Sequence, residues 1–540
     1  MRGQMSGHPL LLSTLLWRAE HIFADKQIVT RTAQGTHRYT YAEFARRTRH
    51  LAGALAVLGV TDGTRVGTLA WNTWRHLEAY YAVPCIGAVL HTVNLRLAPA
   101  QIAQIISHAG DEVLLIDTDQ VPLVESLADR LPTVRHFVVL DDKPPQTPAM
   151  RSCRVYEELI ALAEPVARFP VFDENTASGL CYTSATTGEP KGVLYSHRSM
   201  VLHSLALCAH TSVGIGEEQR TLLITPMFHV NAWGVPHAAV MQGTELVLPG
   251  IHPDVDDYVA LLEQEACTGA VGAVTVGIML REHLTQSGQR RRLESFTRLW
   301  LGGQAVPEGL SRWFADTLGV SVVQGLGMTE ASPLVTFSYL KAADRLAGEA
   351  AVASATQGLP LPLVELRLEA EDGSELPWDG HTRGEVVLRS PWIASGYYDG
   401  PAGAADAFVD GWYRSGDIAS IDSRGYVTVA DRAKDMIKSG GEWISSIQLE
   451  NTLIAHPAVL EAAVVATPHP KWLERPVAVL VLRDPAQPPT RETLDEFLLS
   501  RGIVRWSLPD EYIFVQEVPK TGVGKFDKKR IRAELSGPSG

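Results

Sequence analysis

The segment 180–199 constrains this chain more than any other stretch. It reads LCYTSATTGEPKGVLYSHRS, a short apolar run with strand character followed by a loop crowded with Ser, Thr, Gly, Pro and Lys. Such a loop suits a polyanion, because small hydroxyls and glycine-exposed N–H groups can surround phosphate oxygens while Lys191 supplies positive charge. No Ser or Thr follows Lys191, so the pattern G-x-x-x-x-G-K-[ST] is absent, which argues against an ordinary P-loop NTPase. The residues alone leave a polar surface turn open as the alternative.

Length and charge limit the classes of protein to consider. At 540 residues the chain is too long for one simple core, so at least two domains are expected. Hydrophobic residues make up 45% and charged residues 20%, as in an ordinary soluble globular protein. The net charge of −13 argues against nucleic-acid binding and against docking on anionic lipid. Positive charge must therefore be local wherever phosphate is bound.

Cysteine spacing and hydropathy add two further expectations. The 5 cysteines show no C-x-x-C or C-x-x-H spacing, which predicts neither a disulfide framework nor a zinc site and favours the cytoplasm. Apolar residues at 10–17 lack the basic flank and cleavage site of a secretory signal, so they predict an amphipathic helix. No apolar run reaches the roughly 18 to 20 residues of a membrane span, so no stable membrane insertion is expected.

Alternating helix and strand patterns predict the fold class. Helical spacing in 39–59 precedes strand-like runs at 65–70, 113–116 and 137–140, with helical stretches between them. Strands separated by helices indicate mostly parallel sheets flanked by helices. The sequence therefore predicts an α/β protein whose large N-terminal domain has several subdomains.

A domain boundary is predicted near residue 430. Strand-like alternation ends there, and a basic, glycine-containing segment follows. We expect a large domain over 1–430 and a small, mobile α/β domain over 431–540. For the small domain the patterns predict strands at 462–466, 477–482 and 513–514 and a helix at 491–499.

Two later motifs predict further parts of a ligand site. Segment 320–330, VSVVQGLGMTE, has a strand opening into Gly325 and Gly327, where exposed backbone can lie beside a planar ligand. Glu330 in the same motif offers a hard oxygen ligand for Mg²⁺. Asp417, at the end of WYRSGD, is suited to accept hydrogen bonds from a ribose diol, although Gly-Asp is also common turn chemistry.

The order of these motifs resembles the adenylate-forming superfamily of acyl-CoA synthetases, peptide-synthetase adenylation domains and luciferases. The loop matches the family form Y-T-S-G-T-T-G-x-P-K-G except at Ala185, where the family has Gly. FHVN, QGLGMTE, YRSGD, DRAKD, KSGGEWIS and GVGK follow in the expected order. FHVNAWG, SGGEWISS and HPKWLERP are most similar to bacterial medium- and long-chain fatty acyl-CoA synthetases.

The resemblance implies roles for individual residues. Thr183 and Glu330 would hold Mg²⁺. The β- and γ-phosphates of ATP would be bound by Ser184, Thr186, Thr187, Gly188 and Lys191. Adenine and the α-phosphate would be lined by Gly303, Gln324, Gly325, Leu326 and Thr329. The ribose would be held by Asp417 and Arg432. The family has an aromatic residue at position 326, so Leu326 removes a stacking partner of adenine.

For the acyl group the resemblance implies a pocket lined by His229, Val230, Trp233, Gly277 and Gly303. Each of three has a purely structural alternative: His229 as a packed histidine, Trp233 as a core residue and Gly277 as a site of close backbone packing. Where many members have Gly-x-Pro-Thr, this chain has Gly272, Ala273, Val274 and Thr275, so the floor of the pocket is expected to differ.

The resemblance also implies a moving catalytic domain. Lys525 would bridge the carboxylate and the α-phosphate during adenylation, and Asp431 matches the hinge. After rotation, the face that meets the substrates, including the loop on the coenzyme A side, would present Lys434, Lys438, Gly440, Gly441, Glu442 and Trp443, with Lys438 as a further catalytic candidate.

The function implied is an ATP-dependent acyl-CoA ligase for medium- or long-chain fatty acids, with ATP, Mg²⁺ and coenzyme A as small-molecule partners and a homodimer as the expected assembly. Two alternatives remain: transfer of the acyl group to an acceptor other than coenzyme A, and a nucleotide-binding homologue with weakened catalysis. Ala185, Leu326 and the missing Gly-x-Pro-Thr favour the second, whereas retention of Lys525 argues against it.

Overall fold

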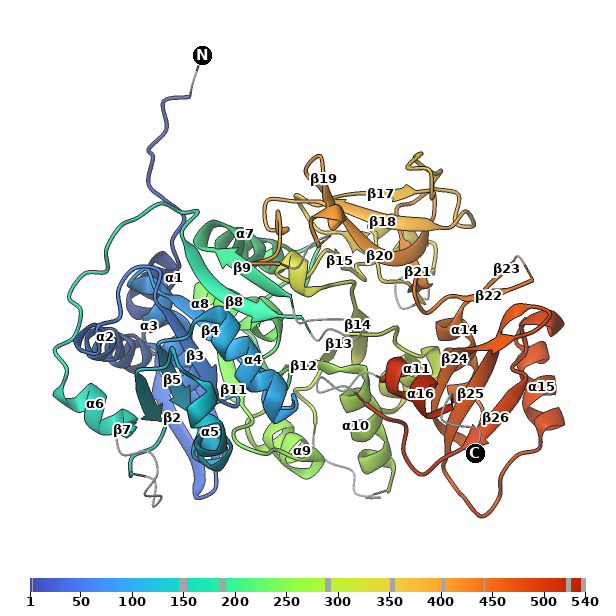
Figure 1. The fold of residues 1–540 in the computed structure, drawn as a ribbon, viewed down its shortest axis with the longest axis horizontal. Coiled ribbons are helices and arrows are strands. Elements are labelled where there is room, and N and C mark those ends of the chain that lie inside the picture. The colour runs from blue at the N-terminus through green and yellow to red at the C-terminus, as the bar shows by residue number, and fades with distance from the viewer. Residues whose placement is uncertain are drawn as a thin grey trace.

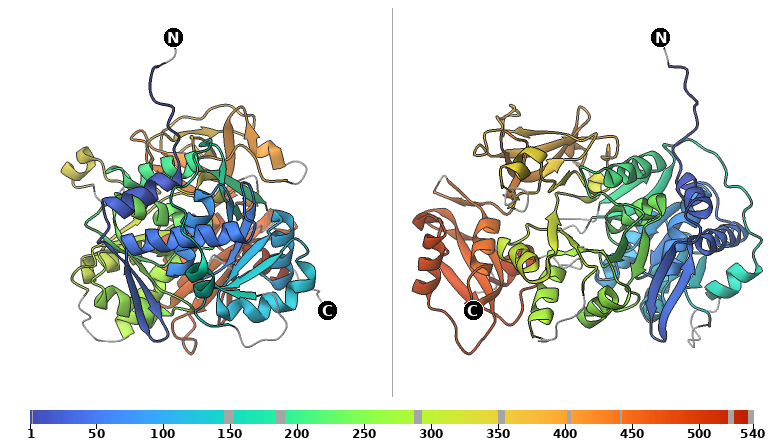
Figure 2. Two further views of the ribbon diagram at one scale, coloured as in Figure 1. Left: turned by 90° about the vertical axis from the view of Figure 1, so that its left-hand side faces the viewer. Right: turned by 180° about the vertical axis from the view of Figure 1, so that it is seen from behind.

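The computed structural model describes residues 1, 3–144, 153–183, 191–286, 293–349, 355–400, 404–440, 442–520 and 526–535. In this part of the chain, two seven-stranded sheets have helices between them and on their outer faces (Figure 1). A β-rich unit and a C-terminal α/β unit follow, and the C-terminal unit lies at one end of the molecule (Figure 2). The predicted α/β class with mostly parallel sheets is confirmed.

Sheet A carries one wall of the site described below. Its strands, in spatial order, are β14 (Ser321–Gln324), β13 (Arg298–Gly302), β12 (Gly269–Ala273), β10 (Arg220–Leu223), β11 (Glu245–Leu248), β1 (Gln27–Thr32) and β2 (Gly35–Thr40). All neighbours pair in parallel except the edge hairpin of β1 and β2. The carboxyl ends of β12, β13 and β14 therefore meet at one edge.

Sheet B contains the strand that leads into the phosphate-loop motif. Its strands, in spatial order, are β7 (Cys153–Val155), β6 (His136–Val139), β5 (Val113–Ile116), β3 (Arg65–Leu69), β4 (Val89–Thr92), β8 (Ala177–Tyr182) and β9 (Gly192–Ser196). Pairing is parallel except between β8 and β9, which form an antiparallel pair.

Helices between the sheets share one core with both. They are α1 (Leu12–His21), α2 (Tyr41–Val57), α3 (Trp74–Cys85), α6 (Tyr156–Leu162), α7 (His197–Cys208) and α8 (Val235–Gln242). Thr40 caps α2 by accepting from the Glu43 amide, and Ser196 caps α7 by accepting from the Ser199 amide, which explains where these helices begin. The amphipathic helix predicted for the N-terminal apolar run is α1, and it is confirmed.

Outer helices bury the other face of each sheet. Sheet A is covered by α9 (Val255–Gln264), α10 (Val274–Gln286) and α11 (Glu308–Leu318). Sheet B is covered by α4 (Pro99–Ala109) and α5 (Val121–Leu127). Within the described residues, none of the helices combines the length and apolar character that crossing a membrane requires.

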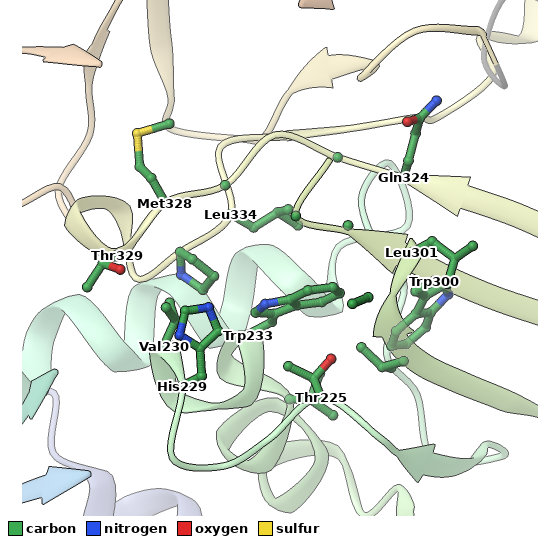
Figure 3. Close-up of a pocket in the computed structure, with 18 of the residues that line it drawn as sticks. Thr225, His229, Val230, Trp233, Trp300, Leu301, Gln324, Met328, Thr329 and Leu334 are labelled. Atoms are coloured by element: carbon green, nitrogen blue, oxygen red, sulfur yellow. The ribbon is translucent and has the colours of Figure 1, made fainter. Parts of the chain in front are cut away.

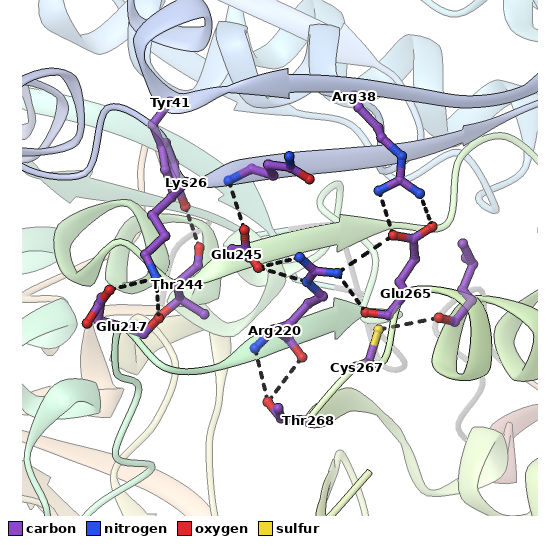
Figure 4. Close-up of polar contacts among 12 residues, drawn as sticks. Lys26, Arg38, Tyr41, Glu217, Arg220, Thr244, Glu245, Glu265, Cys267 and Thr268 are labelled. Carbon is purple, nitrogen blue, oxygen red and sulfur yellow. Dashed lines mark hydrogen bonds and ion pairs between the residues drawn. The ribbon is translucent and has the colours of Figure 1, made fainter. Parts of the chain in front are cut away.

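An ion-pair network ties the edge hairpin to the rest of sheet A (Figure 4). Glu265, whose side chain is only 3% exposed, accepts from Arg38 of β2 with Arg38 Nη1 2.7 Å from Oε2. Arg220 of β10 lies 3.9 Å from the same oxygen, Oε2 of Glu265, and donates to Glu245 of β11 at 2.8 Å. The hydrogen bond to Glu265 raises the pKa of Arg38. A buried carboxylate needs such partners, so the network fixes how the hairpin joins the sheet.

The β-rich unit departs from the expectation of mostly parallel pairing. Its strands are β17 (Glu365–Glu369), β18 (Gly384–Arg389), β19 (Phe408–Val409), β20 (Trp412–Ile421) and β21 (Val427–Arg432), and all pair in an antiparallel manner. One face packs into its own core with alternating burial along β20. β21 continues past residue 430, so the proposed domain boundary falls inside a strand.

The C-terminal unit has a sheet covered on both faces. Its elements are β22 (Ile437–Ser439), β23 (Glu442–Ile444), α14 (Ser446–Ile454), β24 (Val459–His469), β25 (Leu473–Leu482), α15 (Arg491–Ser500), β26 (Glu511–Phe514) and α16 (Lys528–Leu535). The predicted strands at 462–466, 477–482 and 513–514 and the helix at 491–499 all fall within observed elements. β24 and β25 are longer than predicted because they form a long antiparallel hairpin that extends beyond the buried residues.

Short elements connect these units. They are η1 (Thr118–Gln120), η2 (Ala128–Arg130), η3 (Val230–Gly234), η4 (Thr329–Ala331), β15 (Thr336–Phe337), α12 (Ala342–Leu346), β16 (Leu359–Pro360), η5 (Ala404–Ala407) and η6 (Arg505–Ser507). Two of them, η3 and η4, line the site.

Candidate functional site

Two cavities meet at the carboxyl edge of sheet A. The first, here called the apolar cavity, has a volume of about 220 Å³, and the second, the polar cavity, about 270 Å³. Both are lined by Gly303, Gly325, Gly327 and Arg432, so they adjoin at the glycine-rich turns that follow β13 and β14. A ligand at this edge can therefore have one apolar and one charged part.

The wall of the apolar cavity comes from one face of sheet A. Val271, Trp300 and Val323 are direct neighbours in register on β12, β13 and β14, and all three line the cavity. Leu207 and Phe337 contribute from other elements. An apolar cavity of about 150 Å³ is already large enough to bind benzene, so this one has room for a sizeable apolar group.

Trp233 lies on a left-handed turn beside this wall (Figure 3). Four consecutive non-glycine residues of η3, from Val230 to Trp233, have φ between 46° and 59°, and Gly234 follows at 76°. Each such residue costs roughly 1 to 2 kcal/mol, so packing must hold the turn. The indole lies against Gly302: a Cβ there would come within 3.0 Å of it. The sequence-predicted residues His229, Val230 and Trp233 are all brought to the cavity wall.

A buried asparagine that sequence reasoning missed fixes the loop before His229. Asn72 donates to the carbonyls of Leu223 and Thr225 at 2.7 and 2.9 Å, and its Oδ1 accepts from the Met227 amide at 2.7 Å. Asn72 lies in the first half of the chain, so local sequence carries no signal for this contact. Once the structure shows that Asn72 is buried, its amide is expected to have hydrogen-bond partners, because a buried polar group needs them.

Glu330 and its neighbours form the polar end of the apolar cavity. The Tyr397 hydroxyl donates to Glu330 Oε1 at 2.6 Å, and the Lys191 ammonium lies 4.8 Å from the centre of the Tyr397 ring. Burial and the Glu330 charge raise the pKa of Tyr397, which keeps this donor protonated. Tyr397 was not among the site residues predicted from the sequence.

Thr183 lines the same cavity as Glu330, and its amide donates to the Lys191 carbonyl at 2.9 Å. Thr183 shares the cavity lining with Thr329 and Glu330, and Lys191 reaches the same region through its contact with the Tyr397 ring. Ser184, Ala185, Thr186, Thr187 and Gly188 lie outside the described residues. In the described part of the chain, no group of three or more His, Cys, Asp or Glu side chains is arranged to hold a metal ion.

The turn after β14 leaves room only for backbone. A Cβ on Gly325 would lie 2.3 Å from the Thr336 carbonyl oxygen, so a side chain there requires the backbone to shift. The Leu326 amide donates to Thr336 Oγ1 at 3.0 Å, and Gln324 Oε1 accepts from the Val306 amide at 3.0 Å. Gln324, Gly325 and Leu326 are thus held in the cavity walls as the motif predicts.

Asp417 and Arg432 form an ion pair in the polar cavity, with Arg432 Nε 2.5 Å from Oδ1 of Asp417. They are direct partners across β20 and β21, so strand register places them together. Asp417 is buried, and its negative charge raises the pKa of Arg432. The pair lines the same cavity as Leu326, Gly325 and Gly327, and its role in binding a ribose stays a prediction.

Asp431 links the two units through the start of α14. Its Oδ2 accepts from the Ser446 amide at 2.7 Å and from the Ile447 amide at 3.3 Å. A carboxylate is stabilised at a helix N-terminus. Lys528 of α16 donates to Ser446 and pairs with Glu450 at 2.7 Å. The hinge candidate Asp431 is therefore connected to α16 through Ser446 and Lys528.

The polar cavity is also lined by side chains from α16 and from the residue Phe526 shortly before it. Phe526, Lys528, Lys529 and Arg532 line it, opposite Asp417 and the glycine turns. Lys525, the catalytic candidate next to Phe526, lies outside the described residues. Lys434 lines the same cavity, and burial lowers its pKa.

Apart from Lys434, the described residues predicted to face the substrates after rotation lie away from both cavities. Lys438 and Trp443 face each other across β22 and β23, with the ammonium 4.3 Å from the indole centre. Gly440 packs on Trp472 and donates to its carbonyl at 2.9 Å. None of these residues is among the described residues that line either cavity. Gly441 and the side chain of Glu442 lie outside the described part.

Gly277 does not lie where the acyl-pocket prediction put it. It belongs to α10, on the outer face of sheet A, and is not one of the described residues that line the apolar cavity. A Cβ there would come within 2.7 Å of Leu301 and 3.3 Å of Leu310. Gly277 therefore allows α10 to pack closely on the sheet. This is the close backbone packing that the sequence analysis gave as the alternative to a role in the acyl pocket.

Comparisons with known proteins follow the same division of the chain. Residues 16–398 match the model of the AMP-binding enzyme family, and residues 448–525 match that of the AMP-binding enzyme C-terminal domain. The long-chain-fatty-acid–CoA ligase of Thermus thermophilus is 47% identical over 534 residues, which cover 98% of this chain and 96% of that protein.

Two further relatives are similar over almost their whole length. The 3-methylmercaptopropionyl-CoA ligase of Ruegeria lacuscaerulensis is 42% identical, covering 99% of both chains. The medium-chain-fatty-acid–CoA ligase of Ectopseudomonas oleovorans is 40% identical, covering 98% of this chain and 97% of that protein. Family models and relatives together cover both units of the structure, and this chain therefore belongs to the AMP-binding enzyme family.

Proposed function

We propose that this enzyme is an ATP-dependent acyl-CoA ligase that activates a medium- or long-chain fatty acid or a related apolar carboxylic acid. The observation that carries the proposal is the junction of an apolar cavity with a charged one at Gly303, Gly325 and Gly327. The names of the 47% and 40% identical relatives support a fatty acid as the substrate. The alignments with these two relatives cover 96% to 98% of each chain, including the C-terminal unit, which supports both half-reactions and not adenylation alone.

The reaction follows from the chemistry of a carboxylate, which is a poor acyl donor because oxide would have to leave. A carboxylate oxygen attacks the α-phosphorus of ATP. The bond between that phosphorus and the oxygen that bridges to the β-phosphorus breaks, and pyrophosphate leaves with this oxygen. The thiol sulfur of coenzyme A then attacks the acyl carbon, and AMP leaves. Both steps need stabilisation of charge more than a protein nucleophile.

In this proposal the apolar cavity takes the acyl chain and the polar cavity takes the nucleotide. Asp417 and Arg432 hold the ribose, and Lys191 binds phosphate oxygens. His229, beside Thr329 and Glu330 in the cavity wall, orients the carboxylate. A correctly placed donor of this kind contributes on the order of 10² to 10³ in rate.

Magnesium fits the residues present. Mg²⁺ is commonly bound through one or two carboxylates together with substrate phosphates, so Glu330 and Thr183 would suffice without a preformed protein cage. When bound, the ion would neutralise charge on the phosphates. The buried Glu330, held by the Tyr397 hydroxyl, is positioned to serve as that ligand.

The proposal assigns the two half-reactions to two orientations of the C-terminal unit. Lys525, next to the helix that lines the polar cavity, would serve adenylation. Rotation about Asp431 would bring Lys438, Gly440 and Trp443 to the site for thioester formation. A homodimer in the cytoplasm belongs to the same proposal, on the strength of the family resemblance.

The decisive experiment incubates the protein with ATP, Mg²⁺, coenzyme A and acids from C4 to C16 plus aryl acids, and measures AMP and acyl-CoA by mass spectrometry. We expect thioester to peak within the medium- or long-chain range. Lys525→Ala should abolish adenylation yet still form thioester from supplied acyl-AMP, because it acts only in the first step.

Three results would contradict parts of this proposal. Acyl-adenylate without thioester would indicate an acceptor other than coenzyme A. Absence of AMP with every acid, despite ATP binding, would indicate the nucleotide-binding alternative. Equal loss of both half-reactions in Lys525→Ala would contradict the division of labour.

A further inference from the structure

A third cavity, here called the interunit cavity, lies where three parts of the chain meet. Its volume is about 270 Å³, the same as that of the polar cavity. Its walls come from the segment after β13 at Val306, from the β-rich unit at Arg383 and Thr428, and from α14 at Gln448 and Asn451. Small-molecule sites occur preferentially at junctions of this kind. The proposed ligase reaction places no ligand in it.

Strand register turns polar side chains of the β-rich unit toward this cavity. Ser420 and Thr428 are direct partners across β20 and β21. Their chain neighbours Ala419, Ile421 and Val427 have no exposed surface and belong to the core of the β-rich unit. Because side chains alternate along a strand, Ser420 and Thr428 point away from that core, and both line the interunit cavity.

Arg383 supplies positive charge to the same wall. It directly precedes β18, and its neighbour Gly384 pairs with Ala419, so Arg383 comes beside Ser420. The Arg383 side chain is exposed, and in the part of the chain that the structure describes its guanidinium makes no hydrogen bond or ion pair. None of the described residues that line the cavity is Asp or Glu. This charge balance favours an anion as the ligand.

The opposite wall, formed by α14, offers neutral hydrogen-bonding groups. Gln448 and Asn451 lie three residues apart and so on one face of the helix, and both line the cavity. Leu449 and Leu453, on another face, are buried in the core of the C-terminal unit. Carboxamides both donate and accept, so this wall suits the hydroxyl groups of a ligand.

Two buried glutamines lie between the interunit cavity and the site described above. Gln324 lines it and the apolar cavity, and Gln357 lines it and the polar cavity. Gln357 donates to Gln324 Oε1 at 3.3 Å and accepts from the Val429 amide at 2.6 Å, which holds the two side chains in place. A ligand in the interunit cavity would therefore lie across this partition from the proposed nucleotide site.

We propose that the interunit cavity binds a small anion that carries hydroxyl groups, with its anionic group on Arg383 and its hydroxyl groups on the polar side chains of α14. Because the two walls belong to different units, such a ligand holds the C-terminal unit in the orientation described here. The binding goes beyond the proposed function, whereas its expected effect on the two half-reactions rests on that function.

The test titrates the full-length protein with glycerol 3-phosphate by calorimetry while α,β-methylene ATP fills the nucleotide site. We expect one saturable site, and weaker binding of glycerol, which lacks the charge, and of inorganic phosphate, which lacks the hydroxyl groups. Arg383→Gln should weaken binding about tenfold or more, because a hydrogen bond to a charged group is lost. Asn451→Asp should weaken it as well, by placing a carboxylate on the opposite wall.

The matched control is Arg389→Gln, which changes the net charge equally. Arg389 ends β18 and is not among the described residues that line any of the three cavities, so this variant should bind glycerol 3-phosphate as the wild type does. Absence of saturable binding would overturn the proposal, as would equal binding by wild type and Arg383→Gln. Thermal denaturation of each variant shows whether the fold is intact.

Half-reaction rates test the effect on orientation. Saturating glycerol 3-phosphate should slow thioester formation from supplied acyl-AMP about threefold to tenfold and leave pyrophosphate exchange unchanged, and the slowing should disappear in Arg383→Gln. Slowing of both steps, or of neither, would overturn the claim that the ligand favours one orientation. A protein that activates no acid would overturn the proposed function instead, while calorimetry would still decide whether the anion binds.

Discussion

At the residue scale, the Asp417–Arg432 pair illustrates how one contact can combine structure and binding. Asp417 is buried at the polar cavity, whereas the Arg432 side chain is 43% exposed there. The carboxylate therefore fixes the guanidinium and remains at the edge of the proposed ribose site.

We predict that Asp417→Asn weakens ATP binding by about tenfold or more. The amide keeps the shape but loses the charge that holds Arg432, and a charge-assisted hydrogen bond is roughly twice as strong as a neutral one. Calorimetric titration with ATP measures the effect. Asp372→Asn, on an exposed turn where the carboxylate contacts Ser374, serves as the control. Equal affinities of the two variants would contradict a ribose role for Asp417.

Leu326 stands where the resemblance led us to expect an aromatic residue. Its side chain is 9% exposed and packs with Met328 and Val335 in the core of the β-rich unit. It also lines the polar cavity, so it can cover a planar ring by apolar contact without stacking. The Leu326 side chain therefore contributes to the core of the β-rich unit and to the wall of the polar cavity at once.

At the scale of elements, α14 depends on a buried ion pair. Glu450 accepts from the Val464 amide of β24 at 2.8 Å and pairs with Lys528 of α16 at 2.7 Å. Burial raises the pKa of Glu450 to about 6, with the Lys528 ammonium opposing the rise. Three elements of the C-terminal unit therefore meet at one carboxylate.

This pair makes stability depend on pH in a defined direction. A Glu in an unfolded chain has a pKa near 4.3, so between about pH 4 and 6 the folded state binds the Glu450 proton more readily than the unfolded state does. Stability from this group is present below the unfolded pKa and is lost as pH rises through about 6. A shift of this size corresponds to about 2 kcal/mol.

We predict that the stability difference between wild type and Glu450→Gln falls by about 2 kcal/mol between pH 4 and 7, because only the wild type loses that contribution. Urea denaturation at a series of pH values measures it. The same subtraction with Glu158→Gln, on the exposed face of α6, should stay flat. If the stability difference between wild type and Glu450→Gln does not vary with pH, the Glu450 carboxyl has the same pKa in the folded and unfolded states, which contradicts the prediction.

At the scale of the whole molecule, one ion pair joins the C-terminal unit to the helices of sheet A. Arg483 donates to Glu282 of α10 at 2.7 Å, and Leu460 packs against the same core. Hydrogen bonds from Arg483 and Arg281 hold the pKa of Glu282 below its usual range, although partial burial opposes this. The contact favours the orientation in which α16 lines the polar cavity.

We predict that Arg483→Gln slows adenylation about twofold to fivefold and leaves thioester formation from supplied acyl-AMP unchanged. Partly exposed ion pairs are worth up to about 1 kcal/mol, which sets this magnitude. Pyrophosphate exchange reports the first step and acyl-CoA formation the second. The exposed Arg505→Gln is the control. Equal slowing of both steps would mean that the pair supports the fold and not one orientation.

Much of the fold could be predicted because its signals are local. Thr40 and Ser196 begin helices by capping amides three residues on, and period-two burial along β20 is visible in the sequence. The antiparallel pairing of the β-rich unit was not predicted, because strand direction depends on which distant strands meet. The sequence also did not reveal that β21 continues to Arg432, because this end of β21 is held by pairing with Asp417 and Ile418 of β20.

The site was predictable to the extent that motifs are contiguous. Gln324, Gly325, Leu326, Thr329 and Glu330 lie in one stretch, and all of them line the cavities. Asn72, Tyr397 and Lys528 were missed because their roles arise from partners 67 or more residues away in the chain. Gly277 was misplaced because a glycine in an apolar segment does not reveal which face of a sheet its helix covers.

Residue order alone was enough to predict the family and the class of reaction, because the phosphate-loop, QGLGMTE and YRSGD motifs are short and contiguous. Three-dimensional packing decided what those motifs enclose. The depth of the apolar cavity and the left-handed turn under Trp233 arise where strands far apart in sequence converge. Side-chain burial is a property of all the surrounding elements together, so the shape and lining of the cavity became visible only in the folded molecule.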